Sequence, residues 1–326
     1  AFATRLVPVA ATAAFALLVQ RLATRLFGAR AAFFAVAIVT ALPAFLMTGV
    51  LVNPEGLLAP LWVLVLEAIY DLREHDDARR PLALGALIGV AFLAKYTAIL
   101  AVPLAIAYVA SSPETRRWLR RPSFYAAGLV SLAIAAPVVA WNAARGFPSV
   151  RLHLVERVAA PSIATYASNA LHTLVSQLVL FHPLVFPAFA VVGAIAALRA
   201  RRDERFRFLA WMALPTLAFF FVMMVRVRDA EPHWTMVGYV PLAIAMGGLL
   251  DEAFDRFSVR AYFGAVLGTS ALALGLYFVH MASPVLLRHV PEGAYDAAAD
   301  PVNETLGWGR IRDAIDAEAA ALDPRA

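Results

Sequence analysis

Residues 82–121 read LALGALIGVAFLAKYTAILAVPLAIAYVASSPETRRWLRR, and this stretch decides the fold. Apolar residues dominate both sides of Lys95, which is the one charge before Glu114. A single helix over residues 82–110 would be about 43 Å long, whereas the hydrocarbon core of a bilayer is about 30 Å thick. Arginines flank the stretch at residues 73–80 and 116–121, and one crossing would put them on opposite sides of a membrane. The sequence therefore predicts two short helices that turn at Lys95.

The rest of the chain is equally apolar. Of its 326 residues, 62% are hydrophobic and 16% are charged, which is more apolar surface than a soluble protein of this size buries. The apolar runs show no alternation of period two, so helices are favoured over a barrel. The sequence predicts an all-α, polytopic membrane helical bundle of about ten spans, at residues 3–20, 31–52, 56–72, 82–94, 96–110, 123–141, 173–198, 206–225, 234–250 and 261–283.

Charge separates the two sides of this bundle. Every second connector is rich in arginine, and such connectors face the cytoplasm; they lie at residues 21–30, 73–80, 116–121, 199–207 and 256–260. The net charge of +5 is thereby explained by membrane anchoring, so no nucleic-acid partner is expected. The inner connectors are expected to be only basic, which places function on the outer side. There the chain has a tail, residues 284–326, which follows a membrane domain of residues 1–283.

Lys95 has two interpretations. Its ammonium can reach the lipid headgroups from a helix end, as lysines at such ends do. It can instead fix a phosphate at the membrane surface, where a pair 4 Å apart gains about 4 kcal/mol at an effective dielectric constant of 20. Under either interpretation, Lys95→Met is expected to leave the fold nearly intact because methionine fills a similar volume.

Asn53-Pro54-Glu55 opens the third expected span, also with two interpretations. An asparagine N-cap, a proline at the first helical position and an acid in the first turn are a common way for a helix to start. Alternatively, Glu55 is a carboxylate at the rim of an outer cavity, available as a base or to a metal ion.

Two further outer segments gather polar side chains. After Trp141-Asn142, the segment 150–158 places Arg151, His153 and Arg157 where they are either solvated or able to bind an anionic lipid head. Residues 226–234 hold Arg226, His233 and Trp234, and the tryptophan is expected to belong to the interfacial belt. A metal site at His233 would need more ligands, so a divalent cation is left open as a cofactor.

Taken in order, several stretches resemble bacterial lipid-linked-sugar glycosyltransferases of the dolichyl-phosphate-mannose-protein mannosyltransferase-like group, which includes the lipid A aminoarabinose transferases. The resemblance runs over nearly the whole chain, from about residue 22 to Trp308. Its carriers are RLFGARAA at residues 25–32, NPE at 53–55, GVAFLAKYT at 89–97, PVVAWN at 137–142, PHW at 232–234 and GW at 307–308.

The resemblance implies a GT-C fold and inverting transfer of a sugar from an undecaprenyl-phosphate donor to a lipid, glycan or protein acceptor. It implies the bacterial inner membrane, with the active site facing the periplasm. It also implies that Lys95 contacts the donor phosphate, that Glu55 stands where relatives have a functional aspartate, and that the principal catalytic acid lies in a first outer loop upstream of this sequence, after a first span that is also missing.

The expected site residues follow from these outer segments. Glu55 is the catalytic candidate. The candidates for the donor phosphate are Lys95, Tyr96, Arg151, Arg157 and Arg226. Candidates for substrate contacts are Asn53, Asn142, His153, His233 and Trp234.

Two other classes of function compete with the glycosyltransferase. A transporter or lipid flippase usually shows paired broken helices and ionisable residues deep in several spans, whereas here only the Lys95 region has one. A scaffold without activity would not need charged clusters on the outer side.

Overall fold

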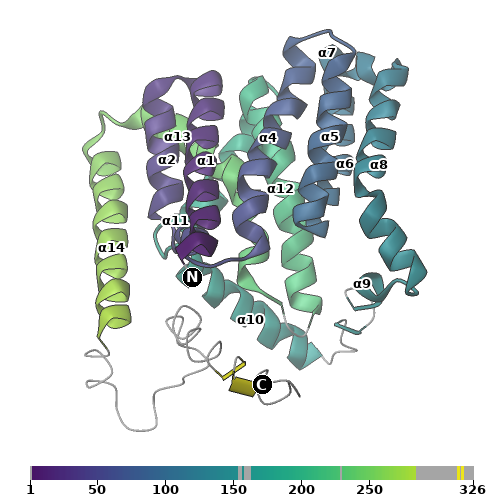
Figure 1. Ribbon diagram of the computed structural model, residues 1–326. Helices are drawn as coiled ribbons and strands as arrows, with labels where there is room; N and C mark the ends of the chain where they lie inside the picture. Colours follow the sequence, from purple (N-terminus) through teal and green to yellow (C-terminus); the bar gives the residue numbers. More distant parts are fainter. Residues whose placement is uncertain are drawn as a thin grey trace. The chain divides into compact units, whose positions relative to one another are not determined.

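The structure is a computed structural model that describes residues 2–152, 156–157, 163–227, 230–283, 314–315 and 317–318. All elements in these ranges are helical (Figure 1). They are α1 (Phe2–Phe27), α2 (Ala29–Ala41), α3 (Pro43–Val50), α4 (Pro54–Glu74), α5 (Arg79–Ala94), η1 (Tyr96–Leu100), α6 (Ala101–Ser111), α7 (Pro113–Arg116), η2 (Arg117–Arg120), α8 (Pro122–Ala144), α9 (Pro148–Arg151), α10 (Ile163–Leu180), α11 (Val185–Arg199), α12 (Glu204–Arg226), η4 (Pro232–Thr235), α13 (Met236–Ala253) and α14 (Phe257–Ala282).

The chain divides into two compact units, Ala1–Leu267 and Gly268–Ala326. The first unit holds every helix up to the first half of α14, and it contains all residues discussed below. The expected outer tail, residues 284–326, lies outside the described residues except for four positions. Its existence as a separate domain therefore stays a prediction.

The predicted class, an all-α polytopic membrane bundle, is confirmed, but the number of spans is lower than the expected ten. Within the described residues, five helices are long and apolar enough to cross a membrane, and three bent helix pairs raise that number to at most eight. The expected spans at 56–72 and 82–94 correspond to α4 and α5, which do not qualify. α4 carries Glu67, Asp71 and Glu74 in its second half, and α5 has only 16 residues.

Two of the expected spans are broken. The span expected at 31–52 bends by 68° between α2 and α3, where Pro43 begins the second helix. Proline lacks the N–H of a helix interior and disfavours helical backbone in the residue before it, so the break falls at Leu42. The span expected at 173–198 is wrong as a single helix. α10 begins at Ile163 and meets α11 at an angle of 101°, with His182 between them in a left-handed conformation at φ 70°.

The predicted turn at Lys95 is confirmed. α5 ends at Ala94, Lys95 is extended with φ −158° and ψ 133°, and the 3-10 turn η1 follows. The arginine clusters before and after this stretch meet as predicted, because Arg121 donates to Asp76 at 2.8 Å and Arg117 lies 3.3 Å from the same carboxylate. The hydrogen bond from Arg121 lowers the pKa of Asp76.

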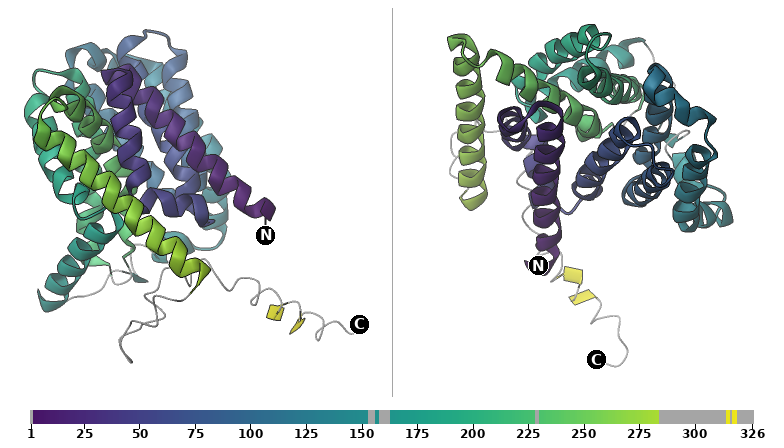
Figure 2. Two further views of the ribbon diagram at one scale, coloured as in Figure 1. Left: turned by 90° about the vertical axis from the view of Figure 1, so that its left-hand side faces the viewer. Right: turned by 90° about the horizontal axis from the view of Figure 1, so that it is seen from above.

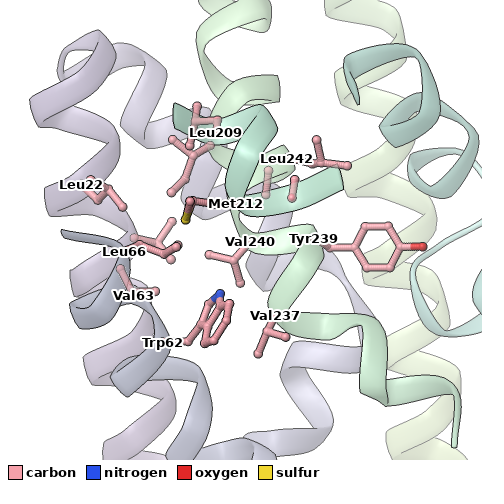
Figure 3. Packing of buried hydrophobic residues seen from close by; sticks show 14 of the residues in the cluster. Leu22, Trp62, Val63, Leu66, Leu209, Met212, Val237, Tyr239, Val240 and Leu242 are labelled. Atoms are coloured by element: carbon pink, nitrogen blue, oxygen red, sulfur yellow. The ribbon is translucent and has the colours of Figure 1, made fainter. Parts of the chain in front are cut away.

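The core of the first unit lies where α1, α4, α12 and α13 pack together (Figure 3). Trp62 and Leu66 of α4 face Met212 of α12 and Val240 of α13, and all four side chains are buried. α13 is buried along nearly its whole length, so it is the central helix of this unit. α13 contacts α1, α2, α4, α11 and α12, and two further views of the ribbon are given in Figure 2.

Glycines allow the closest helix contact, between α5 and α8. A Cβ on Gly85 would lie 2.1 Å from the backbone oxygen of Ala127, and a Cβ on Gly89 would lie 2.8 Å from the side chain of Ile134. The two glycines are four residues apart, the small-residue spacing that lets membrane helices approach each other.

The arginine-rich connectors gather at one end of the bundle, but they are not only basic. Arg25 pairs with Asp71 at 2.6 Å, Arg199 pairs with Glu252 at 2.7 Å, and Arg205 donates to the carbonyl of Leu26 at 3.3 Å. The expectation of a purely basic inner face was wrong, because half of this network comes from acids in the last turns of the spans and in the connectors themselves.

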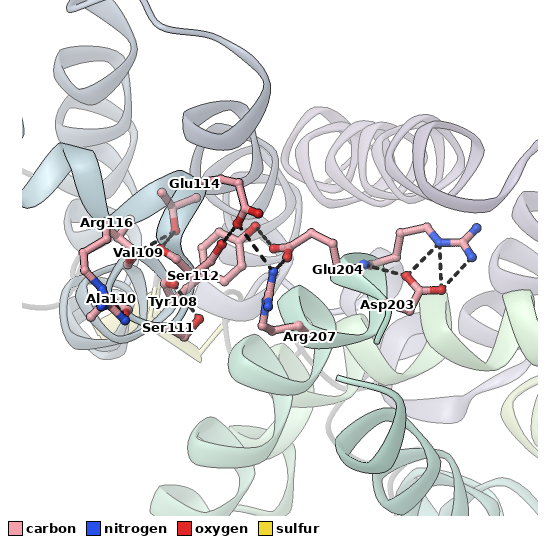
Figure 4. A network of polar contacts seen from close by, with 12 residues as sticks. Tyr108, Val109, Ala110, Ser111, Ser112, Glu114, Arg116, Asp203, Glu204 and Arg207 are labelled. Atoms are coloured by element: carbon pink, nitrogen blue, oxygen red, sulfur yellow. Dashed lines mark hydrogen bonds and ion pairs between the residues drawn. The ribbon is translucent and has the colours of Figure 1, made fainter. Parts of the chain in front are cut away.

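A second part of the same network joins α6 to α12 (Figure 4). Tyr108 donates to Glu204 at 2.6 Å, and Arg207 pairs with Glu204 while lying 4.0 Å from Glu114. Every described charge in this group has a partner of opposite sign, which is typical of a structural network rather than a binding site.

Candidate functional site

The site begins at the first turn of α4, at the end of the bundle opposite the arginine network. Asn53 is the N-cap of α4, and its side-chain oxygen accepts a hydrogen bond from Gly56 N at 3.0 Å. The helix-start interpretation of Asn53 is therefore observed. Glu55 does more than complete that start, because its side chain is only 7% exposed and forms two contacts with other elements.

The first contact joins Glu55 to Lys95. The ammonium of Lys95 donates to Glu55 Oε1 in a close ion pair, and the lysine side chain is 19% exposed. Lys95 lies between α5 and η1, outside every helix that could span a membrane. Burial lowers the pKa of Lys95 to about 8, and the nearby Glu231 carboxylate acts in the opposite direction. Lys95 thus has a buried partner, which a lysine that only reaches for the headgroups does not need.

The second contact joins Glu55 to His233. His233 Nε2 lies 2.7 Å from Glu55 Oε1, and its Nδ1 lies 3.5 Å from Glu231 Oε2. His233 is on the short turn η4, which precedes α13 and begins at Pro232. Its position follows from the sequence locally, because a proline at the first helical position sets the backbone for a turn.

These three side chains line one pocket. Its other walls come from α3, α4, η1, η4 and α13, and its lining is mostly apolar. The lining residues are Phe45, Glu55, Leu58, Ala59, Lys95, Thr97, His233, Trp234, Met236, Val237 and Val240. A small set of convergent polar groups among apolar walls is the usual form of a ligand site.

The pocket's charges indicate what it can bind. The Lys95 ammonium donates to Glu55 Oε1, and His233 Nε2 lies 2.7 Å from the same oxygen. A lysine ammonium has three donors, of which Glu55 takes one, so donors remain for an anion. In this arrangement the Glu55 carboxylate contacts both the lysine and the histidine, and Lys95 is the cationic side chain of the pocket lining.

The other expected residues lie at varying distances from this pocket. Tyr96 stacks on Phe92 and places its hydroxyl 3.4 Å from Ser149. Arg157 lies over Trp234 with 6.0 Å to the ring centroid, which brings a second cation to the η4 side. Arg151 is 70% exposed and pairs with Glu156 at 2.8 Å, which fits the solvated interpretation.

Asn142 and Arg226 also do not line the pocket. Asn142 is buried, donates to Val138 O at 3.0 Å and accepts from Ser149 N at 3.2 Å, so it fixes the turn from α8 to α9. Arg226 is exposed in the last turn of α12. His153 lies outside the described residues.

A divalent cation would need several ligand side chains close together. Within the ranges that the structure describes, no group of three or more histidine, aspartate or glutamate side chains is arranged to hold a metal ion.

Sequence reasoning missed the groups that hold η4 in place. Gln177 of α10 is fully buried, and it bonds to Thr235, Tyr239 and the carbonyl of Pro232. The available signal was weak, because Gln177 is one of several polar residues in α10, although polar groups in membrane helices often bond to a neighbouring helix.

Known proteins share this fold and parts of this sequence. Residues 1–141 match the family described as dolichyl-phosphate-mannose-protein mannosyltransferase. Lipid A galacturonosyltransferase RgtD of Rhizobium johnstonii is 24% identical over 228 residues, which are 70% of this chain and 47% of that protein. Two crystal structures of ArnT from Cupriavidus metallidurans, one in the apo state and one bound to undecaprenyl phosphate, superpose with a TM-score of 0.57 at 22% identity.

These superpositions cover 91% and 92% of this chain, and 52% and 53% of ArnT. The chain therefore spans about half the length of the relatives it matches. It is a multi-pass membrane protein with the helical fold of ArnT, and its residues 1–141 are similar to the dolichyl-phosphate-mannose-protein mannosyltransferase family.

Proposed function

We propose that this chain is part of a membrane glycosyltransferase that moves a sugar from a polyprenyl-phosphate donor to an acceptor on the outer face of the cytoplasmic membrane. The observation that carries the proposal is the pocket at the end of the bundle opposite the arginine network, where the partly buried Lys95 pairs with Glu55, which also contacts His233. The family match and the lipid A galacturonosyltransferase relative support sugar transfer, and an ArnT structure with undecaprenyl phosphate supports a polyprenyl-phosphate donor.

The physics of such a donor agrees with the position of the pocket. A polyprenyl chain stays in the bilayer because each buried CH₂ contributes about 0.8 kcal/mol, so its phosphate is presented at the membrane surface. A protein that uses this phosphate must bring a cation to the same depth. Lys95 meets that requirement because it lies at the end of the bundle opposite the arginine network, at the turn between α5 and η1.

Sidedness follows from charge. Connectors rich in arginine stay in the cytoplasm, so the opposite end, which carries the pocket, faces outward. In the proposed reaction Lys95 holds the donor phosphate and stabilises the charge that develops on it as the sugar leaves. Glu55 and His233 keep the ammonium directed into the pocket, and Arg157 adds positive charge beside Trp234.

Transfer of radiolabel tests the proposal. Membranes that contain the protein are incubated with a radiolabelled polyprenyl-phosphate sugar and with membrane lipids as acceptors. Appearance of label in a lipid, glycan or protein fraction is the expected result, and it should fall at least tenfold in a Lys95→Met/Glu55→Gln variant. If no sugar moves while a fluorescent polyprenyl phosphate changes leaflet, the protein is a lipid transporter.

A further inference from the structure

We infer that Gln177 is a positioning residue that sets His233 against Glu55 by locking the turn η4 to α10. The inference rests on the proposed function of the pocket, and it concerns residues that do not line it. Its basis is a set of buried hydrogen bonds on the far side of η4.

Gln177 uses both ends of its amide on η4 and the start of α13. Its Nε2 donates to the carbonyl of Pro232 at 2.9 Å. Its Oε1 accepts from the hydroxyl of Thr235 at 2.8 Å and from that of Tyr239 at 3.0 Å. Thr235 also lies 3.1 Å from the carbonyl of Pro232, which closes the network.

These groups are deeply buried. Gln177 and Thr235 are both 0% exposed, and Tyr239 is 2% exposed. A buried amide that loses its hydrogen-bond partners is strongly destabilising, so this network favours a single arrangement of η4. The side chains come from α10, η4 and α13, and only α10 lies outside the segment that carries His233.

The network brackets His233 in sequence. Pro232 precedes it directly and Thr235 follows it by two residues, so both flanking points are held by Gln177. η4 has only four residues and leads directly into α13, so the bonds from Gln177 tie this short turn to a separate helix, α10. If η4 moved so that His233 receded from Glu55 by about 1 Å, the 2.7 Å contact between His233 Nε2 and Glu55 Oε1 would lie beyond hydrogen-bonding range.

The bend between α10 and α11 brings Gln177 next to η4. α10 meets α11 at 101° and runs obliquely near the pocket end of the bundle, so its buried face meets η4 (Figure 1). Thr173 and Gln177, one turn apart, are its two buried polar residues. A straight span over residues 173–198 would not present Gln177 in this direction.

The test follows His233 directly and needs no donor. The chain contains seven histidines, so ring ¹⁵N signals are assigned to His233 by their loss in His233→Gln. Wild type is expected to show the Nε2 signal of a ring hydrogen-bonded to a carboxylate. Gln177→Met keeps the volume and removes all three bonds, and the expected result is a shift of that signal toward the value found in Glu55→Gln.

Two variants separate positioning from general stability. Tyr239→Phe removes one of the bonds to Gln177 and should shift the His233 signal in the same direction by less. Asn169→Leu is the matched control, because Asn169 also lies on α10 and donates to a backbone carbonyl, that of Val225 at 3.1 Å. It should lower the thermal stability but leave the His233 signal unchanged.

An unchanged His233 signal in Gln177→Met would overturn the inference, and so would an equal shift in Asn169→Leu. If Gln177→Met does not fold, Tyr239→Phe decides in its place. The inference about Gln177 and the proposed function fail separately, because absence of sugar transfer in wild type would contradict the function and leave the His233 measurement as it stands.

Discussion

Lys95→Met should destabilise the protein, and a second substitution at Glu55 should restore it. The sequence alone predicted a nearly intact fold for this variant, because methionine fills a volume similar to that of lysine. In the structure the lysine is the main counter-charge of a carboxylate that is 7% exposed. Removing one partner of a buried ion pair costs about 3–5 kcal/mol, since the other charge is left without compensation.

Protonation of Glu55 limits that cost. A carboxyl with an ordinary pKa of about 4.3 can be protonated at pH 7 for about 4 kcal/mol, so the penalty cannot exceed this value. His233 at 2.7 Å remains as a donor and offsets part of the loss, which gives an expected cost of about 3 kcal/mol at pH 7. The penalty is present above the ordinary pKa of the carboxyl and shrinks as the pH falls, to about 1 kcal/mol at pH 5.

The assay is reversible unfolding in detergent at pH 7 and at pH 5. Glu55→Gln/Lys95→Met contains no buried charge and should unfold within about 1 kcal/mol of wild type at both pH values. Arg151→Met is the control, because it breaks an exposed ion pair and should cost less than about 1 kcal/mol. If Lys95→Met matches wild type in stability at both pH values, the ion pair is not buried and the lysine only reaches for the headgroups.

Three further predictions concern packing, sidedness and pH. Gly85→Ala should destabilise the protein by about 1–3 kcal/mol, because the new Cβ would lie 2.1 Å from the backbone of α8. Gly128→Ala is the control, because a Cβ there has open space and should not destabilise the protein. Thermal unfolding of both variants measures the difference. The chain has no cysteine, so Val52→Cys and Ala78→Cys each place a single thiol, at opposite ends of α4. An impermeant maleimide added to intact cells should label the Val52→Cys variant only. Equal labelling of the two variants would contradict the proposed orientation. Binding of undecaprenyl phosphate should weaken about tenfold between pH 7 and pH 9. The reason is that the pKa of Lys95 is lowered to about 8, so the side chain is charged below that pH and neutral above it. An unchanged affinity would exclude the ammonium from phosphate binding.

Much of the fold was predictable because charge and hydropathy act locally. The turn at Lys95 followed from the arginines on its two sides, and the contacts of Asp76 with Arg117 and Arg121 agree with it. The break between α10 and α11 was not predictable in the same way. Residues 173–198 are apolar enough for one span, and the left-handed backbone at His182 depends on packing that hydropathy does not report.

The site was predictable as a set of side chains but not as a set of contacts. Glu55, Lys95 and His233 stood out because charged and polar groups are unusual at the ends of apolar spans. Their meeting could not be deduced, since they are separated by 40 residues or more and come from three elements. Asn142 was also expected to contact substrate, but its hydrogen bonds fix the local turn from α8 to α9 instead.

The most direct test of the account is whether the pocket distinguishes a phosphate from an alcohol on the same polyprenyl chain. Native mass spectrometry of the purified protein measures binding of undecaprenyl phosphate and of undecaprenol, to wild type and to Glu55→Gln/Lys95→Met. The account predicts that wild type binds the phosphate at least tenfold more tightly than the alcohol, and that the double variant binds both equally. Equal binding of the two lipids by wild type, or an undiminished preference for the phosphate in the double variant, would contradict it.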